Sequence, residues 1–270
     1  MNWRRISSHR LVSQWTGKSW RSMHSPTLFR MARALQENPK HWPEGATLLD
    51  DKVALQSIRA LRSKWRASSA TLEQYDHGAG SRVKHGSGQT NRAVSHLARH
   101  VLTQESDAEA MARWLRSLHT QGKVLELGTS LGLTAMHFVR SGWDVETWEG
   151  CPNTMAWARS GWQSLGVEGC VRSRVGTFQS MLEALDENAC WDVVFLDGHH
   201  EGQATRHLVD ALAPRVSHAL VVDDIAWSEG MHEAWMAVQD SEDWRVSVVW
   251  RGRGILLKAP HMAKQRVRLA

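Results

Sequence analysis

From residue 122 onward, short β-rich runs alternate with stretches of helical periodicity, and this alternation restricts the fold more than any other feature. Strands are predicted at residues 123–127, 144–148, 171–175, 192–196 and 220–222. Strands that alternate with helices are typical of βαβ units, which build a parallel sheet covered by helices on both faces. Two further runs, residues 244–250 and 254–258, flank an Arg-Gly-Arg-Gly turn and predict an antiparallel hairpin. We therefore expect a doubly wound, mostly parallel α/β sheet of seven strands with an antiparallel C-terminal edge.

The part of the chain that precedes this sheet differs in charge. Residues 1–100 carry 17 Lys and Arg against 6 Asp and Glu, whereas residues 101–270 carry 16 against 22. We expect a basic, mainly helical N-terminal extension over residues 1–104 and the α/β domain over residues 105–270. A helix is predicted to begin at residues 106–109, whose Ser-Asp-Ala-Glu pattern is that of a capping box.

Composition narrows the class of protein. No apolar run approaches the length of about 20 residues that spans a bilayer, so we expect a soluble, cytoplasmic protein with no membrane partner. Three cysteines are too few for a disulfide framework and are expected to be reduced thiols. The 15 tryptophans are interpreted as core and groove filling. A homo-oligomer is compatible with the sequence.

The first predicted strand leads directly into a turn of sequence Gly-Thr-Ser-Leu-Gly at residues 128–132. Glycine at such a strand-to-helix turn lets a ligand approach the backbone closely. The spacing Glu-x-Gly-x-Ser-x-Gly differs from the Gly-x-Gly-x-x-Gly of dinucleotide-binding proteins. Glu126 would repel a pyrophosphate and attract a cationic amino acid, and Glu149, 21 residues after Gly128, can accept both ribose hydroxyls. These features indicate a nucleoside that carries an amino acid.

This pattern resembles the class I S-adenosylmethionine-dependent methyltransferases, which have a Rossmann-like fold and a Glu/Asp-x-Gly-x-Gly-x-Gly motif. The resemblance covers roughly residues 105–258. It implies that the turn lies at the methionine moiety, that Glu149 binds the ribose and that residues 176–178 lie near the adenine. The cofactor-binding residues implied are Glu126, Gly128, Thr129, Ser130, Glu149, Gly150, Gly176, Thr177, Phe178 and Asp197. The alternative is a tight turn in an unrelated α/β protein.

Acidic residues follow two further predicted strands. Asp197 follows the strand at 192–196, and the pair Asp223 and Asp224 follows the strand at 220–222. Because ligands bind at the carboxyl ends of strands in an open α/β sheet, we expect these carboxylates to converge. Their mutual repulsion must be neutralised, and Mg²⁺, which prefers oxygen ligands, is one solution. The alternative has no metal, with Asp197 at the methionine amino group and Asp223 capping a turn.

The positions of these acids are also similar to those in the metal-dependent O-methyltransferases of the catechol and macrocin types. That resemblance implies Asp197, Asp223 and Asp224 as metal ligands. Closer still is a bacterial methyltransferase group that shares the Gly-Ala-Gly-Ser-Arg segment at residues 78–82 and the Asp-Asp-Ile-x-Trp-Ser segment at residues 223–228. This similarity extends into the N-terminal half and identifies no substrate.

Two histidines, His199 and His200, directly follow Asp197 and its neighbouring glycine. A histidine that titrates near neutrality can act as the general base for a hydroxyl or an amine. We assign this role to His200, together with Asp197, because the resembling methyltransferases often carry histidine at that place. The alternative is that both histidines are surface or packing residues.

The glycine-rich stretch at residues 77–88 is either a hinge or a loop that reaches the active site. Arg82 within it could bind a carboxylate or phosphate, and we assign Arg82 and Trp227 to the substrate side. The arginines and tryptophans of the first 21 residues raise RNA as a less favoured partner, because cations bind phosphates and aromatic rings stack on bases. The alternative is a solvated helical face that covers the acidic domain.

We therefore predict a methyltransferase that transfers a methyl group from S-adenosyl-L-methionine to an oxygen of a small molecule, with Mg²⁺ as a candidate second cofactor. Two alternatives remain open. One is an RNA-directed methyltransferase or RNA-binding protein that uses the basic N-terminal region. The other is a non-catalytic nucleotide-binding scaffold.

Overall fold

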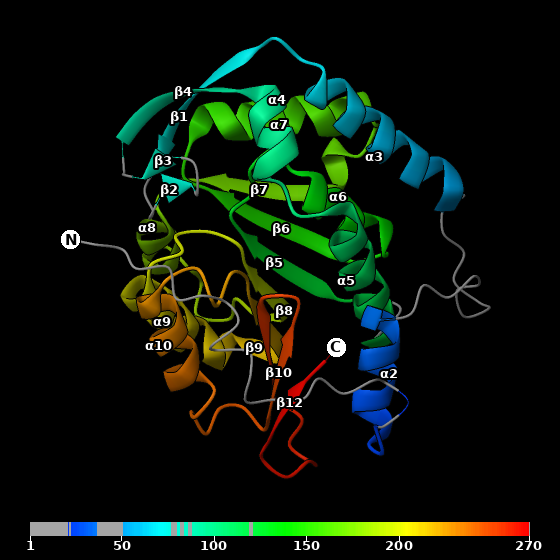
Figure 1. The fold of residues 1–270 in the computed structure, drawn as a ribbon, viewed down its shortest axis with the longest axis vertical. Helices are drawn as coiled ribbons and strands as arrows, with labels where there is room; N and C mark the ends of the chain where they lie inside the picture. The colour runs from blue at the N-terminus through cyan, green and yellow to red at the C-terminus, as the bar shows by residue number, and fades with distance from the viewer. Residues whose placement is uncertain are drawn as a thin grey trace.

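The computed structural model describes residues 21, 23–36, 51–76, 80–81, 84–85, 88–118 and 121–269. An eight-stranded sheet forms its centre, in the order β12-β10-β11-β9-β8-β5-β6-β7 (Figure 1). The strands are β5 Lys123–Leu127, β6 Asp144–Glu149, β7 Val171–Val175, β8 Trp191–Leu196, β9 Val216–Val222, β10 Val246–Trp250, β11 Arg253–Leu257 and β12 Gln265–Arg268. All seven predicted strands are present, and the five from β5 to β9 are parallel.

The C-terminal edge of the sheet is the predicted hairpin with one addition. Strand β11 pairs antiparallel with both β9 and β10, as the Arg-Gly-Arg-Gly turn indicated. The eighth strand, β12, then pairs parallel with β10. The sequence did not predict β12 because its four residues, Gln-Arg-Val-Arg, bury only Val267 and so have no apolar run.

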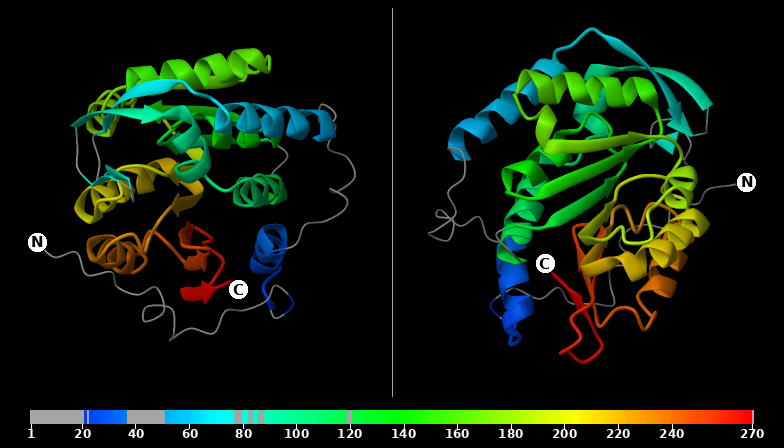
Figure 2. Two further views of the ribbon diagram at one scale, coloured as in Figure 1. Left: turned by 45° about the horizontal axis from the view of Figure 1, so that its top comes forward. Right: turned by 180° about the vertical axis from the view of Figure 1, so that it is seen from behind.

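Helices cover both faces of the sheet, which confirms the doubly wound α/β prediction. Helices α8 Phe178–Glu183, α9 Gly202–Leu212 and α10 Glu229–Val238 lie on one face, with a core that includes Leu208 and Trp235. Helices α2 Pro26–Gln36, α5 Glu105–Leu118, α6 Leu133–Arg140 and α7 Pro152–Ser164 lie on the other (Figure 2). Successive strand residues alternate between the two cores: Val194 and Leu196 face the first, and Val193 and Phe195 the second.

The N-terminal half contains more than the helices that its periodicity predicted. Helices α3 Asp51–Arg66 and α4 Val94–His100 are separated by an antiparallel ribbon of β1 Thr71–Asp76 and β4 Gly88–Ala93, beside a short pair of β2 Gly80–Ser81 and β3 Lys84–His85. The expectation of a mainly helical extension was therefore incomplete. Neither ribbon strand has a strong apolar alternation, which explains why the sequence did not reveal it.

This N-terminal half shares its core with the α/β part. Helix α2 packs against α5, and α3 packs against α4 and α6. Leu28 of α2 and Ile58 of α3 are buried in the same cluster as Trp114 of α5 and Phe138 of α6. The predicted boundary between residues 104 and 105 falls between α4 and α5, and apolar packing crosses it.

Tryptophan is mainly a core residue in the described part of the chain. Nine tryptophans are buried there: Trp65, Trp114, Trp143, Trp148, Trp162, Trp191, Trp235, Trp244 and Trp250. This distribution agrees with the interpretation of tryptophan as core filling. Among the described residues, no helix is both long and apolar enough to cross a membrane.

Candidate active site

The loops that follow the parallel strands meet at one edge of the sheet. Strands β9, β8, β5, β6 and β7 are neighbours in this order, so their carboxyl ends lie side by side. The backbone N–H of Asp197 donates to the carbonyl of Leu127 at 2.8 Å, and that of Asp223 donates to the carbonyl of Leu196 at 2.9 Å. The predicted site residues of three strands are thereby brought together.

Gly128 is required where the loops after β5 and β8 touch. Its φ is +103°, and a Cβ at this position would lie 2.2 Å from the carbonyl oxygen of Asp197. No side chain fits in that space without moving backbone. Gly132, at the start of α6, has φ +77° and accepts a 2.9 Å hydrogen bond from the Trp162 indole. The glycines of the motif therefore permit close contacts of the turn with the loop after β8 and with α7.

Glu149, at the end of β6, holds the glycine-rich turn in place. One carboxylate oxygen accepts the backbone N–H of Ser130 at 2.9 Å, and the other accepts that of Cys151 at 3.0 Å. A carboxylate oxygen has capacity for more than one donor, so these bonds are compatible with ribose hydroxyls at the same group. Gly150 lies between Glu149 and Cys151 and links β6 to α7.

Glu126 is 1% exposed inside the sheet, beneath the same turn. It accepts a 2.6 Å hydrogen bond from the hydroxyl of Thr147. Burial raises the pKa of Glu126 to about 8, against the opposing effect of that hydrogen bond. The Thr129 hydroxyl also lies 2.6 Å from that of Thr147, so its side chain is used within the sheet and only its backbone is available to a ligand.

The residues predicted near the adenine lie at the adjacent strand end. Gly176 donates its N–H to the Glu149 carbonyl at 3.0 Å, and Thr177 caps α8 by accepting the N–H of Ser180. A Cβ on Gly198 would lie 3.1 Å from the ring of Phe178, so this ring rests on the loop after β8. The structure therefore brings these three residues beside the loop that carries Asp197.

Asp197 and Asp223 form a buried acidic pair at the centre of the site. Burial, and next the nearby Asp223 carboxylate, raise the pKa of Asp197 well above its usual range. Burial also raises the pKa of Asp223, although the Arg253 guanidinium opposes this change. Asp224 adds further negative charge and donates its N–H to Asp223 at 2.8 Å. The predicted convergence of the three carboxylates is present.

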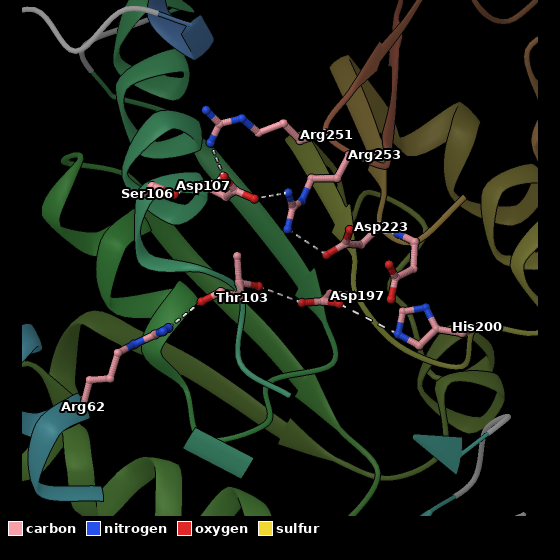
Figure 3. A network of polar contacts seen from close by, with 10 residues as sticks. Arg62, Thr103, Ser106, Asp107, Asp197, His200, Asp223, Arg251 and Arg253 are labelled. Carbon is pink, nitrogen blue, oxygen red and sulfur yellow. Dashed lines mark hydrogen bonds and ion pairs between the residues drawn. The ribbon is translucent and has the colours of Figure 1, made fainter. Parts of the chain in front are cut away.

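Arg253 supplies a positive charge between α5 and the end of β9 (Figure 3). The sequence did not single out this residue. Its guanidinium donates to Asp107 at 2.7 Å and to Asp223 at 3.2 Å. Arg251 donates to the other oxygen of Asp107 at 2.6 Å. The Arg-Gly-Arg-Gly turn was the available signal, but pairing across 146 residues could not be read from it.

Helix α5 does not begin with the predicted capping box. It begins at Glu105, one residue before Ser106, and the N–H groups of Asp107 and Ala108 donate to the carbonyl of Gln104. The Ser106 hydroxyl donates to Asp107, and Glu109 pairs with Arg59 of α3. The two capping side chains of the predicted box are therefore used in other contacts.

His200 lies in the predicted place for a proton acceptor. Its Nε2 is 3.9 Å from an oxygen of Asp197, and its ring stacks on Trp227 with centroids 5.5 Å apart. His199 instead packs its ring edge against Phe178. The structure thus separates the two histidines and brings His200, Asp197 and Trp227 together.

Helix α3 of the N-terminal half reaches this group through Thr103. The Thr103 hydroxyl donates to Asp197 at 3.1 Å, and the Thr103 carbonyl accepts a hydrogen bond from Arg62 of α3 (Figure 3). On the cofactor side, Gln74 of β1 donates to Thr154 at 3.0 Å in α7. The N-terminal half therefore supports both parts of the site. Arg82, assigned to the substrate side, lies outside the described residues.

Backbone strain gathers at the same strand ends. Among the described residues, six other than glycine have positive φ: Ser130, His199, His200, Asp224, Arg251 and Ala259. Ser130, His200 and Asp224 belong to the predicted site, His199 directly precedes His200, and Arg251 binds Asp107. Left-handed backbone costs free energy in residues with a Cβ and is typically retained at functional sites.

Residues 125–225, which span this whole set of loops, match the family model described as a methyltransferase domain. This segment is a methyltransferase domain. None of the curated proteins matches the sequence. Solved methyltransferases bound to S-adenosylmethionine or S-adenosylhomocysteine share the fold of this chain.

Three of these structures show how far the similarity extends. Cofactor-bound Rv0187 from MTB has a TM-score of 0.54 and 18% identity, over 79% of this chain and 93% of that one. The O-methyltransferase from Bacillus cereus in complex with SAH has 0.51 and 12%, over 76% and 91%. The O-methyltransferase TomG from Streptomyces achromogenes, involved in tomaymycin synthesis and solved with SAM, has 0.50 and 17%, over 60% and 83%.

The carboxylates of the methyltransferase domain are a poor fit for a divalent metal. Among the residues that the structure describes, no group of three or more His, Cys, Asp or Glu side chains is arranged to hold a metal ion. Both oxygens of Asp223 already accept hydrogen bonds, from Arg253 and from the N–H of Asp224. The neutralising charge, for which Mg²⁺ was one predicted candidate, is present as the guanidinium of Arg253.

A separate cleft of about 260 Å³ lies between α2, α3, α5 and the β10–β11 turn. Its wall includes Arg59, which is paired with both Glu105 and Glu109, so its charges compensate one another. The strand-end site carries the motif residues and most of the strained backbone, whereas this cleft carries no motif residue and, of the strained residues, Arg251. We therefore assign the chemistry to the strand ends.

Proposed function

We propose that the methyltransferase domain moves a methyl group from S-adenosylmethionine to an oxygen of a small-molecule acceptor. The observation that carries this proposal is the group of Asp197, His200 and Trp227 beside the glycine-rich turn. It puts a carboxylate, an imidazole and an aromatic surface where an acceptor hydroxyl would meet the cofactor. The solved O-methyltransferases that share the fold support the same class of acceptor.

The residues present fit a nucleoside with an amino-acid moiety. Gly128 lets the turn after β5 pack against the backbone of Asp197, and Glu149 fixes the N–H of Ser130 in that turn. We assign the ribose to Glu149, the methionine amino group to Glu126 and Asp197, and the adenine to the strand end that carries Phe178. When bound, S-adenosylmethionine supplies an electrophilic methyl group on its sulfonium.

The chain's own residues orient the acceptor and remove its proton. The His200 ring, held by Trp227 on one face, is placed to accept a proton at Nε2 from an acceptor hydroxyl. Asp197, 3.9 Å from that nitrogen, stabilises the imidazolium that results. Fixed orientation of donor and acceptor contributes most of the remaining acceleration, for which about 7 kcal/mol or more is available.

Calorimetric titration of the chelator-treated protein with S-adenosylhomocysteine tests the cofactor site. We expect micromolar binding by the wild type and its loss in Glu149→Ala. The matched control is Glu233→Ala, which removes an exposed carboxylate of α10. Absence of binding by a folded wild-type protein would refute the proposed function and favour an RNA-binding protein or a scaffold.

Methyl transfer to fractionated small molecules from a cell extract tests the acceptor class. We expect transfer of labelled methyl to a fraction of low molecular mass. The product should resist treatment that cleaves esters, as an ether does. Cofactor binding without transfer to any fraction would favour the scaffold. The RNA alternative rests on arginines and tryptophans of the first 21 residues, and residues 1–20 lie outside the described residues. Arg59 and Arg62, basic residues that the structure describes, are used in contacts within the chain.

A further inference from the structure

The position of Arg253 follows from strand pairing. Gly254 of β11 pairs with Val222 of β9, so Arg253 stands opposite the residue after β9, which is Asp223. Arg253 is 5% exposed, and its guanidinium lies 5.7 Å from the centroid of the Trp250 ring. The sheet itself therefore fixes a permanent cation at the strand ends, since arginine stays protonated in proteins.

Two carboxylates hold this guanidinium in one orientation. Asp107 of α5 accepts from Nη1 at 2.7 Å, and Asp223 accepts from Nη2 at 3.2 Å. Arg251 occupies the second oxygen of Asp107. Arg253 consequently joins α5, on one face of the sheet, to the acidic end of β9 (Figure 3).

This arrangement leads to an inference that rests on the proposed function and deepens it. We propose that Arg253 is the built-in cation of the acceptor site, that it takes the place of a divalent metal, and that the methyltransferase works without one. Arg253 acts through Asp223 and is a positioning residue. It keeps the carboxylate cluster assembled and leaves Asp197 and His200 to handle the acceptor proton.

The bonding around the cluster supports this inference. Mg²⁺ requires near-octahedral oxygen ligands, and carboxylates would supply them here. Asp223 has committed one oxygen to Arg253 and the other to the Asp224 N–H, and Asp197 accepts the Thr103 hydroxyl. A divalent ion would have to break these bonds beside a positive guanidinium, which repels it.

Binding of Mn²⁺, a paramagnetic substitute for Mg²⁺, tests the inference without any assay of activity. Chelator-treated wild-type protein is mixed with Mn²⁺, and the free ion is measured by electron paramagnetic resonance. We expect the wild type to leave the free-ion signal unchanged. Arg253→Met removes the charge, keeps much of the volume and should raise Mn²⁺ affinity by about tenfold or more, because a close cation no longer repels the ion.

Two controls make the result specific to Arg253. Arg251→Met removes the neighbouring arginine, which binds Asp107 but makes no bond to Asp223, and should gain no Mn²⁺ binding. Arg253→Met combined with Asp223→Asn should lose the binding that Arg253→Met gained. Arg253→Lys keeps a cation and should therefore bind no Mn²⁺. It serves as the folded reference if Arg253→Met does not fold.

The outcomes that overturn the inference are direct. Saturable Mn²⁺ binding by the wild type that Asp223→Asn or Asp197→Asn abolishes would mean that the carboxylates form a metal site. A folded Arg253→Met that binds no Mn²⁺ would mean that the guanidinium does not occupy a metal's place. Parallel titration with S-adenosylhomocysteine separates these results from failure of the proposed function, because cofactor binding does not depend on Mn²⁺.

Discussion

Burial, rather than a charged partner, controls the protonation of Glu126. The residue lies within the sheet and has one neutral hydrogen-bond donor, the Thr147 hydroxyl. A buried carboxyl without a cation nearby holds its proton to higher pH. The ammonium of an amino-acid moiety would be such a cation. Cofactor binding near neutral pH should therefore release a proton from Glu126.

This difference makes the stability of the unliganded protein depend on pH. The folded state keeps the Glu126 proton up to a pKa of about 8, whereas the unfolded state releases it near 4.5. Stability from this group is therefore present at low pH and is lost as pH rises through the folded-state pKa, by at most about 1.4 kcal/mol per pH unit. In Glu126→Gln, the thermal unfolding midpoint should change less between pH 4.5 and about pH 8 than it does in the wild type. A wild-type profile parallel to that of Glu126→Gln would contradict the assignment.

His200 and His199 are adjacent residues with different surroundings, and this makes them a matched pair. His200→Ala should lower kcat for methyl transfer by about a hundredfold or more, because it removes the group that takes the acceptor proton. The KM for S-adenosylmethionine should not change. His199→Ala, which removes a ring packed on Phe178, should not lower kcat to the same extent. Steady-state kinetics of the two variants tests this prediction. Equal losses of kcat would mean that His200 does not take the acceptor proton.

At the scale of elements, the site depends on how closely the loops after β5 and β8 approach. Gly128 permits that approach because a Cβ would lie 2.2 Å from the backbone of Asp197. In the proposed function, these two loops carry the cofactor and acceptor residues respectively. Their spacing would then align the methyl donor with its acceptor.

Gly128→Ala should damage both stability and cofactor binding. Gly166 is the control, because it also has positive φ, at +69°, but nothing lies within 4 Å of an added Cβ. Gly166→Ala should cost about 1–2 kcal/mol, the price of the left-handed backbone alone. Gly128→Ala should cost more and weaken S-adenosylhomocysteine binding, as measured by denaturant unfolding and calorimetry. Equal losses in the two variants would mean that the loop contact is unimportant.

At the scale of the whole molecule, the N-terminal half is part of the enzyme. Helices α2 and α3 bury apolar residues against α5 and α6, and Arg62 and Thr103 connect α3 to Asp197. Part of the basic charge of this half is paired with carboxylates of α5, such as Glu105. These contacts support an enzyme that needs the N-terminal half, whichever partner the remaining basic residues bind.

Deletion of residues 1–104 tests this dependence. The truncated chain would expose buried side chains of α5 and α6, including Trp114 and Phe138. We expect it to bind a hydrophobic dye and to unfold without a cooperative transition, because large apolar surfaces lose their cover. Cooperative unfolding and unchanged S-adenosylhomocysteine affinity in the truncated chain would show that residues 105–270 fold and bind alone.

The sequence by itself determined the five parallel strands, the closing hairpin and most of the strand-end residues, from Gly128 and Glu149 to Asp223. These features are local: each combines a short apolar run with the residue that ends it, and parallel topology then gathers the ends on one edge. The ribbon of β1 and β4 and the strand β12 lacked that signal, because their side chains have little apolar alternation.

Only the tertiary structure decided how the acidic cluster is neutralised. Asp107 and Arg253 are 146 residues apart, and strand register brings Arg253 to Asp223 while helix packing brings Asp107 to the same guanidinium. The three local carboxylates indicated the need for a neutralising charge, for which Mg²⁺ was one candidate beside a metal-free alternative. A charge pair between distant elements has no periodic or spaced pattern in the chain, so the identity of the cation emerges only when the sheet and α5 are packed together.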